Sequence, residues 1–178
     1  MKRSRYLATV LVLLLGVTGC ATGAPGEAPA SSTGTEKGEA VESELTWQEA
    51  KARTLAMQLE VAKLIPKDKV VKINHKKTGT LLSCSRTLFN WNGSTTATLS
   101  KDTEVEPVVM MIEEHYQDSR FKIKTRTDPS ESYEVQLRSP DTAEIYIISA
   151  GWDPDTIRIA SGSPCFTLPE GVYPGGDF

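Results

Sequence analysis

Apolar side chains recur at helical spacing between residues 46 and 65. They fall three or four residues apart, on one helical face, at Trp47, Ala50, Thr54, Met57, Val61 and Leu64. Thr46 and Glu49 fit a capping box at the start of this segment. Pro66 ends it, because proline disfavours helical backbone in the residue before it. We predict a helix whose apolar face packs on the core, the alternative being a partner-binding face.

Residues 67–77 combine five lysines with a short apolar run at Val70, Val71 and Ile73. A short edge strand fits this pattern, because hydrated lysines discourage edge-to-edge pairing between sheets. The alternative interpretation is a contact with an anionic surface, either lipid headgroups or a cell-wall polymer.

Strand-like alternation follows over residues 80–99. Apolar side chains occupy every second position on both sides of Asn92-Gly93, at Phe89, Trp91, Ala97 and Leu99. An Asn-Gly pair between two alternating runs is a strong local indication of a β-hairpin. We therefore predict two strands joined by a tight turn at Asn92-Gly93.

A second helix is predicted from about Thr103 to Tyr116. Thr103 and Glu106 fit a cap, and Pro107 falls in the first turn, where no intrahelical donor is lost. The expected buried face consists of Val105, Val108, Val109, Ile112 and Tyr116.

The rest of the chain has the pattern of an antiparallel meander. Four short alternating runs contain Ile123, Val135, Ile145 and Ile157, and proline-containing turns at residues 128–130, 139–141 and 153–155 separate them. In the third run we expect Ile145 to face the core and Tyr146 to face outward. The predicted fold class is α+β, a mostly antiparallel sheet with two helices packed on one face, in the order α-β-β-α-β-β-β-β.

The first twenty residues follow a different pattern. Basic residues precede an apolar run over residues 7–17, and Thr18 and Gly19 lead directly to Cys20. The basic–apolar–small order is that of a secretory signal peptide. With a cysteine directly after Thr18 and Gly19, the segment resembles the lipobox of bacterial lipoproteins. The apolar run is about half of the roughly 20 residues that span a bilayer, so we expect no membrane span.

The lipobox resemblance implies three parts of the chain. Residues 1–19 are a lipoprotein signal peptide, which signal peptidase II removes after the Cys20 thiol receives a diacylglyceryl group. Residues 20–44 are the lipidated cysteine and a flexible tether, since Val41 is their only large aliphatic residue and apolar surface is too scarce to order the backbone. Residues 45–178 form a single α+β domain.

The same resemblance accounts for an odd number of cysteines in an exported protein. If Cys20 is acylated, Cys84 and Cys165 remain, and such thiols usually join outside the cytoplasm. We predict a Cys84–Cys165 disulfide, the alternative being two buried reduced thiols. Beyond Cys165 the Pro- and Gly-rich tail is expected to be loosely held.

One face of the meander is a candidate binding site. Its outward positions are predicted to carry Lys122, Lys124, Arg126, Arg138, Tyr146 and Arg158. A docking face for a protein or an anionic glycan is the functional interpretation. A wet face of mixed charge, stabilised by cross-strand pairs, is the alternative.

Other chemistry finds little support in the sequence. The two histidines, His75 and His115, lie forty residues apart in no metal-binding motif, and we recognise no catalytic constellation, so no catalytic residue, metal or cofactor is predicted. The formal net charge is −3 and becomes more negative once the basic signal peptide is removed, so nucleic acid is not an expected partner.

The expected function is that of a membrane-anchored extracytoplasmic lipoprotein at the cell membrane. We expect a non-enzymatic binding module of the cell envelope, whose partner is an envelope protein or an anionic polymer. The tether, capped helix and cysteine pair resemble small cell-envelope lipoproteins of high-GC Gram-positive bacteria. One alternative is a small-ligand carrier with a pocket between helices and sheet, lined by Trp47, Phe89, Trp91 and Tyr116. An envelope hydrolase is a further alternative.

Overall fold

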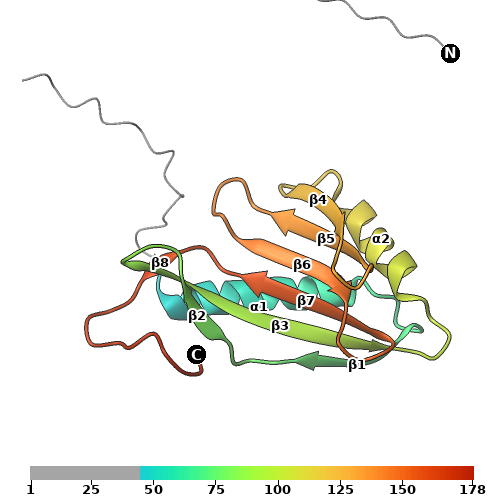
Figure 1. The fold of residues 1–178 in the computed structure, drawn as a ribbon, viewed down its shortest axis with the longest axis horizontal. Coiled ribbons are helices and arrows are strands. Elements are labelled where there is room, and N and C mark those ends of the chain that lie inside the picture. The colour runs from blue at the N-terminus through green and yellow to red at the C-terminus, as the bar shows by residue number, and fades with distance from the viewer. Residues whose placement is uncertain (1–44) are drawn as a thin grey trace, which may run out of the picture. The chain divides into compact units, whose positions relative to one another are not determined.

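The computed structural model describes residues 45–178, which form two helices and eight strands (Figure 1). In chain order the elements are α1 Trp47–Lys63, β1 Val70–His75, β2 Thr80–Ser83, β3 Leu88–Leu99, α2 Val105–Tyr116, β4 Lys122–Thr127, β5 Tyr133–Arg138, β6 Ile145–Ala150, β7 Thr156–Gly162 and β8 Phe166–Thr167. The predicted signal peptide, Cys20 and the predicted tether lie outside the described residues.

The strands form one antiparallel sheet in the order β1-β3-β7-β6-β5-β4, and the short strands β2 and β8 also pair with β3. The predicted α+β class is confirmed. Three strands separate the helices, and β1 lies at one edge of the sheet, with β4 at the other. The proline-containing turns connect β4 to β5, β5 to β6 and β6 to β7, as predicted.

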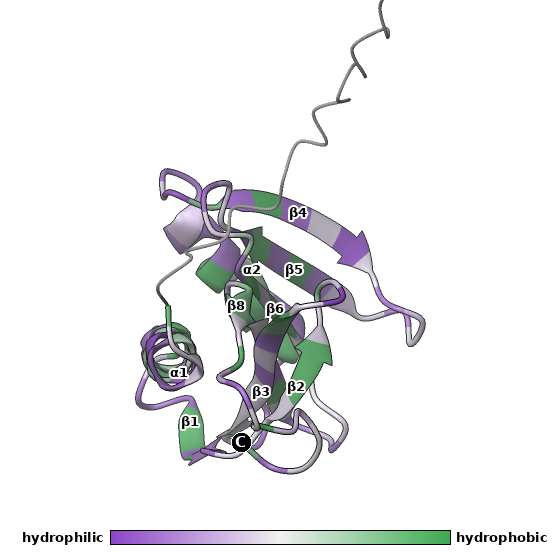
Figure 2. Cartoon of the chain, turned by 90° about the vertical axis from the view of Figure 1, so that its left-hand side faces the viewer, coloured by the Kyte–Doolittle hydropathy of each residue, from purple (hydrophilic) through white to green (hydrophobic). Residues whose placement is uncertain are grey.

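Both helices pack on the same face of the sheet (Figures 1 and 2). Met57 and Val61 of α1 and Ile112 of α2 belong to one apolar cluster, together with Leu137 of β5 and Ile159 of β7. No helix within residues 45–178 covers the opposite face of the sheet, which we call the open face. In the same part of the chain, no helix is both long and apolar enough to cross a bilayer.

The two helices differ in how they begin. At α1 the predicted capping box is present, because Glu49 N donates to Thr46 Oγ1 at 3.3 Å and Thr46 N donates to Glu49 Oε2 at 3.0 Å. At α2 the predicted Thr103 cap is wrong. Glu104 occupies the N-cap position without a side-chain hydrogen bond, and the Thr103 hydroxyl lies 2.8 Å from that of Ser100 instead.

The predicted turn at Asn92-Gly93 is also wrong. β3 runs through both residues as one strand of twelve residues, paired with β2 and β1 along one edge and with β7 along the other. Gly93 is required here by packing rather than by a turn: a Cβ atom at this position would lie 2.2 Å from Cη2 of Trp91, whose side chain is fully buried. The glycine leaves room for the indole ring.

The predicted disulfide is present and joins Cys84, just after β2, to Cys165, just before β8. The tail beyond it is held more firmly than predicted. Phe178 exchanges two backbone hydrogen bonds with Gly79, at 2.8 and 3.0 Å, and its ring meets that of Trp47 edge-on with centroids 5.3 Å apart. Phe166, Leu168 and Phe178 of the tail belong to the apolar cluster around Trp91.

Candidate functional site

The open face brings together five of the six residues that the sequence predicted for a binding site. Lys122 of β4 pairs with Arg138 of β5, and Lys124 pairs with Gln136. These residues point away from the face on which Leu137 is buried. The predicted Arg126 follows Lys124 on the same face, and Arg158 of β7 reaches it because Ile157 and Ile159 are buried on the helix side. β4, β5 and β7 thus all carry cations onto one surface.

Tyr146 does not belong to this surface, contrary to the prediction. It is fully buried and pairs with Leu137 and Ser161, which face the helices. Residues 145–148 are apolar without interruption, so their own pattern cannot say which side faces the core, and pairing with the neighbouring strands decides it. Burial raises the pKa of the Tyr146 hydroxyl above its ordinary value, with Glu144 adding to the shift.

The basic side chains of the open face differ in how far they are neutralised. Arg126 Nε donates to Glu134 Oε1 at 2.6 Å, and this bond raises the pKa of the guanidinium. Lys122, Lys124 and Arg138 form no ion pair with any carboxylate among residues 45–178. These three side chains therefore present uncompensated positive charge at one end of the open face.

Arg158 has an aromatic partner instead of a carboxylate. Its guanidinium carbon lies 5.7 Å from the ring centroid of Trp152, in the β6–β7 turn. The Trp152 side chain is 89% exposed, which makes it the most exposed large apolar residue in the described part of the chain. The cation–π contact holds the indole ring beside the open face.

β3 adds a feature that the sequence analysis missed. All of its open-face positions between Asn90 and Thr98 carry amide or hydroxyl side chains, at Asn90, Asn92, Ser94, Thr96 and Thr98. Asn92 Nδ2 donates to Asn90 Oδ1 at 2.9 Å, so the two amides are ordered relative to each other. The period-two recurrence of hydrogen-bonding side chains was visible in the sequence, but the false turn at Asn92-Gly93 divided it.

A groove of about 360 Å³ lies on the open face over β3 and β7. Its lining includes Lys76, Thr80, Leu82, Asn92, Ser94, Arg158, Ala160 and Asp177. Two cations, Lys76 and Arg158, and one carboxylate, Asp177, are the charged groups among these lining residues. The groove is therefore polar and carries excess positive charge.

Charge is distributed unevenly over the domain. The whole chain has 23 acidic and 20 basic residues, yet basic side chains predominate on the open face. On the helix side, α2 carries Glu106, Glu113 and Glu114 and neither lysine nor arginine, whereas α1 has three basic and two acidic residues. The predominance of basic side chains gives the open face a positive potential on a protein that is acidic as a whole.

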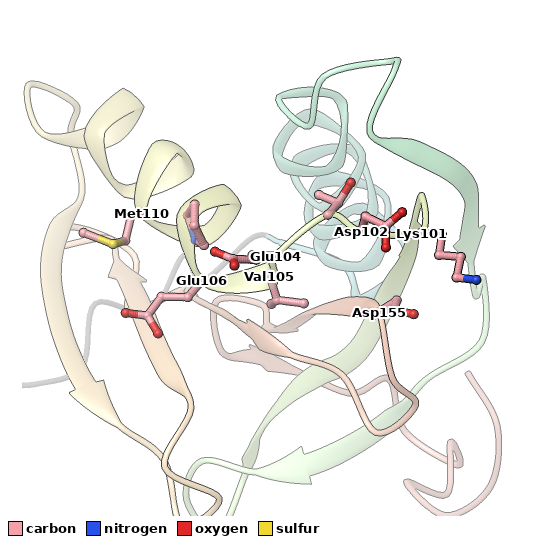
Figure 3. A pocket seen from close by; sticks show the side chains of 9 residues that line it. Lys101, Asp102, Glu104, Val105, Glu106, Met110 and Asp155 are labelled. Carbon is pink, nitrogen blue, oxygen red and sulfur yellow. The ribbon is translucent and has the colours of Figure 1, made fainter.

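A larger pocket, of about 950 Å³, lies beside the start of α2 (Figure 3). Its charged lining residues are Lys101, Asp102, Glu104, Glu106 and Asp155, and the figure shows their side chains spread around the pocket rather than converging. Among the residues described, no group of three or more His, Cys, Asp or Glu side chains is placed to hold a metal ion. This pocket gives no indication of its ligand.

One charged cluster is buried on the helix side of the sheet. Glu144 has no exposed surface and lies 2.6 Å from Arg120 Nη2 and 3.9 Å from Arg53 Nε. The two arginine side chains are about half exposed, at 50% and 42%. The carboxylate is enclosed by the fold, so we assign the cluster a structural role.

A second buried network connects His75 of β1 to α1. Thr95 Oγ1 donates to Gln58 Oε1 at 2.8 Å, and Gln58 Nε2 donates to the Ser161 hydroxyl. Because the only Thr95 hydroxyl proton is used in that bond, His75 Nδ1, 3.0 Å away, must be the donor to Thr95. Burial, with a smaller contribution from Lys77, lowers the pKa of His75.

The aromatic residues proposed for a carrier pocket do not line one cavity. Trp47, Phe89 and Trp91 pack in one apolar cluster with Phe166. Tyr116 belongs to the other cluster, which both helices form with the sheet. Trp91 is fully buried and Tyr116 is 4% exposed, so their side chains fill space rather than border it.

Comparisons of the chain with protein-family models, with curated proteins and with solved structures found no match. Functional inference therefore depends on the residues and geometry of this chain.

Proposed function

We propose that the protein is a bacterial lipoprotein that is anchored through Cys20 on the extracytoplasmic side of the cell membrane and binds an anionic polymer of the cell envelope without enzymatic activity. The resemblance of residues 1–20 to a lipoprotein signal supports the anchor. The unpaired cations of the open face support the polyanionic partner, and they are the observation that carries the proposal.

The extent of the open face favours a polymer over a small anion. One row of paired residues runs across five strands, from Lys124 through Gln136, Ile147 and Ala160 to Ser94. At the usual spacing of adjacent strands, this row is about 19 Å long. A single small anion cannot contact the cations at both ends of such a surface, whereas an extended chain with regularly placed charges can.

The composition of the open face favours a polar polymer over a protein. The central part of a protein–protein interface is usually apolar and poor in charged residues. Here the exposed side chains are mainly amide, hydroxyl and cationic, and the isoleucines Ile145 and Ile147 are only partly exposed. The surface can therefore offer hydrogen bonds and positive charge over a wide area, while its large exposed apolar side chains, Leu82 and Trp152, are isolated among polar ones.

The anchor is tested by replacing Cys20. We expect the full chain, expressed in a bacterial host that processes lipoproteins, to fractionate with membranes and to carry the mass of a diacylglyceryl group. We expect Cys20→Ala to lose both the added mass and the membrane association. An unacylated wild-type chain in mass spectrometry would contradict the anchor.

Polymer binding is tested with the full chain in detergent and four soluble polyanions: poly-L-glutamate, polyphosphate, polygalacturonate and dextran sulfate. We expect binding that weakens with salt, as expected for exposed charges. The triple variant Lys122→Glu, Lys124→Glu and Arg138→Glu should lose affinity by a factor of at least about 100. This estimate follows from a binding free energy of roughly 1 kcal/mol for each basic residue near an anionic surface.

The matched control reverses three exposed lysines at the end of α1 and just after it, at Lys63, Lys67 and Lys69. This control has the same change in net charge but leaves the open face intact, and we expect its affinity to remain within about threefold of wild type. Equal losses in the two triple variants would show that net charge alone governs binding, and no binding to any of the polyanions would contradict the proposed partner.

A further inference from the structure

We propose that the groove over β3 and β7 is a sugar subsite, so that the anionic polymer is an acidic polysaccharide with one ring seated against Asn92 and Ser94 and a neighbouring ring on Trp152. This inference rests on the proposed function and adds the chemical class of the polymer. The juxtaposition that carries it is a groove lined by short hydrogen-bonding side chains and two cations, one of which, Arg158, also contacts an exposed indole ring outside the groove lining.

The floor of the groove is suited to hydroxyl groups. Asn92 and Ser94 offer an amide and a hydroxyl on β3, and β7 contributes Ala160, whose short side chain leaves space above the sheet. The next open-face position of β7 is Gly162, where a Cβ atom would lie 3.0 Å from Asn90 Nδ2. The missing side chain at Gly162 therefore leaves room for the Asn90 and Asn92 amides, which offer donors and acceptors for pyranose hydroxyls.

The cations stand on both sides of this floor. Lys76 follows β1, on one side of β3, and Arg158 belongs to β7 on the other side. A guanidinium can bind a carboxylate, sulfate or phosphate oxygen pair in a bidentate geometry, and an ammonium adds a mobile point charge. Asp177, the carboxylate in the lining, is an acceptor for a sugar hydroxyl rather than a partner for an anion.

Trp152 gives the subsite a flat apolar surface. Its side chain is 89% exposed, and its ring lies 5.7 Å from the guanidinium carbon of Arg158, which lines the groove. Exposing so large an apolar ring is unfavourable in water, and the described part of the chain does not cover it. The C–H faces of a sugar ring are apolar while its edges carry hydroxyls, so one ring of the polymer can stack on Trp152 while a neighbouring ring reaches the polar floor of the groove.

The test compares sugar and non-sugar polyanions with the full chain in detergent. We expect polygalacturonate and dextran sulfate to bind at least about tenfold more tightly than poly-L-glutamate and polyphosphate at equal charge concentration. Trp152→Ala should weaken binding of the two sugar polymers about tenfold, the loss typical of a central aromatic contact, and leave the other two polymers within about twofold. Because Trp152 is exposed, this variant should fold normally.

The matched control is Tyr173→Ala, which removes another exposed aromatic side chain, 80% exposed, whose ring has no cation–π contact with Lys76 or Arg158 of the groove. We expect it to bind all four polymers as wild type does. Asn92→Ala is a second test, on the floor of the groove, and should show the same selective loss as Trp152→Ala. A urea denaturation curve like that of the wild type would show that this variant is folded.

The outcomes separate this inference from the proposed function. Equal binding of sugar and non-sugar polyanions, with Trp152→Ala without effect, would overturn the sugar subsite and leave the anionic-polymer module standing. Absence of binding to all four polyanions would overturn both. Selective binding of the sugar polymers that depends on Trp152 and Asn92 would support the subsite.

Discussion

Arg120 places its Nη2 atom 2.6 Å from Oε1 of Glu144, a side chain with no exposed surface. The guanidinium also lies 4.2 Å from the ring centroid of Phe121, and Nη1 is 3.4 Å from the Ser139 hydroxyl. These contacts join the α2–β4 connection to the β5–β6 connection, and Arg53 adds α1 to the same cluster. A buried charge therefore links three segments that are distant in sequence.

We predict that the two partners of this pair are unequal in their effect on stability. Arg120→Ala leaves a buried carboxylate with Arg53 at 3.9 Å as its nearest cation and a long hydrogen bond of 3.5 Å from the Tyr146 hydroxyl, and it should lower the free energy of unfolding by about 2–4 kcal/mol. Glu144→Gln leaves arginines that are half exposed and still solvated, so its effect should be less than half as large. Urea denaturation followed by circular dichroism measures both.

The control for these variants is Lys63→Ala, an exposed residue whose loss should change stability by no more than about 0.5 kcal/mol. Equal destabilisation by Arg120→Ala and Glu144→Gln would contradict the asymmetry that we infer from burial.

Gly93→Ala is predicted to destabilise the domain by about 1–3 kcal/mol. The new methyl group would lie 2.2 Å from Trp91 Cη2, and the fully buried indole has no free space to enter, so the core must be overpacked. In a double-mutant cycle, Trp91→Leu should remove most of the additional loss due to Gly93→Ala. Ser94→Ala changes the adjacent residue, which lies on the open face, and should leave the free energy of unfolding almost unchanged. Additive effects in the cycle would refute the packing explanation.

Acidification should destabilise the domain through His75. Its pKa is lowered in the folded state from an ordinary value of 6.5, so the unfolded chain binds the proton more readily. The neutral ring therefore contributes stability above pH 6.5, and this contribution is lost as the pH falls through the folded-state pKa. We expect the free energy of unfolding to decrease between pH 7 and pH 5, measured by urea denaturation.

Replacing His75 should remove that part of the pH dependence. His75→Asn is expected to flatten the slope between pH 7 and pH 5, even if the variant is less stable throughout. His115→Gln, at an exposed position of α2, should keep the wild-type slope. An unchanged slope in His75→Asn would assign the pH dependence to other groups.

Loss of the disulfide should lower stability by roughly 2–4 kcal/mol, because Cys84 and Cys165 close a loop with a sequence separation of 81 residues. Thermal unfolding of the double variant Cys84→Ala and Cys165→Ala measures this loss. Dithiothreitol should destabilise the wild type by a similar amount and leave the double variant unchanged. A wild type that is insensitive to the reductant, despite complete reduction shown by thiol labelling, would contradict the prediction.

Features with local causes were predictable from the residues alone. The start of α1 depends on Thr46 and Glu49, three residues apart, and its buried positions Ala50, Met57 and Val61 follow from helical spacing. The meander and its turns likewise follow from alternation and proline positions. The alternation of lysine and arginine with other residues on β4 correctly placed Lys122, Lys124 and Arg126 on a common face.

Only the tertiary structure decided the features that depend on which strands are neighbours. Asn92-Gly93 has the composition of a turn, but pairing on both edges and the Trp91 ring hold it within β3. Tyr146 sits in an unbroken apolar run, so its side of the sheet is set by its pairing with β5 and β7. Contacts between distant segments are invisible to local periodicity, and they bury Glu144 next to Arg120 and Arg53.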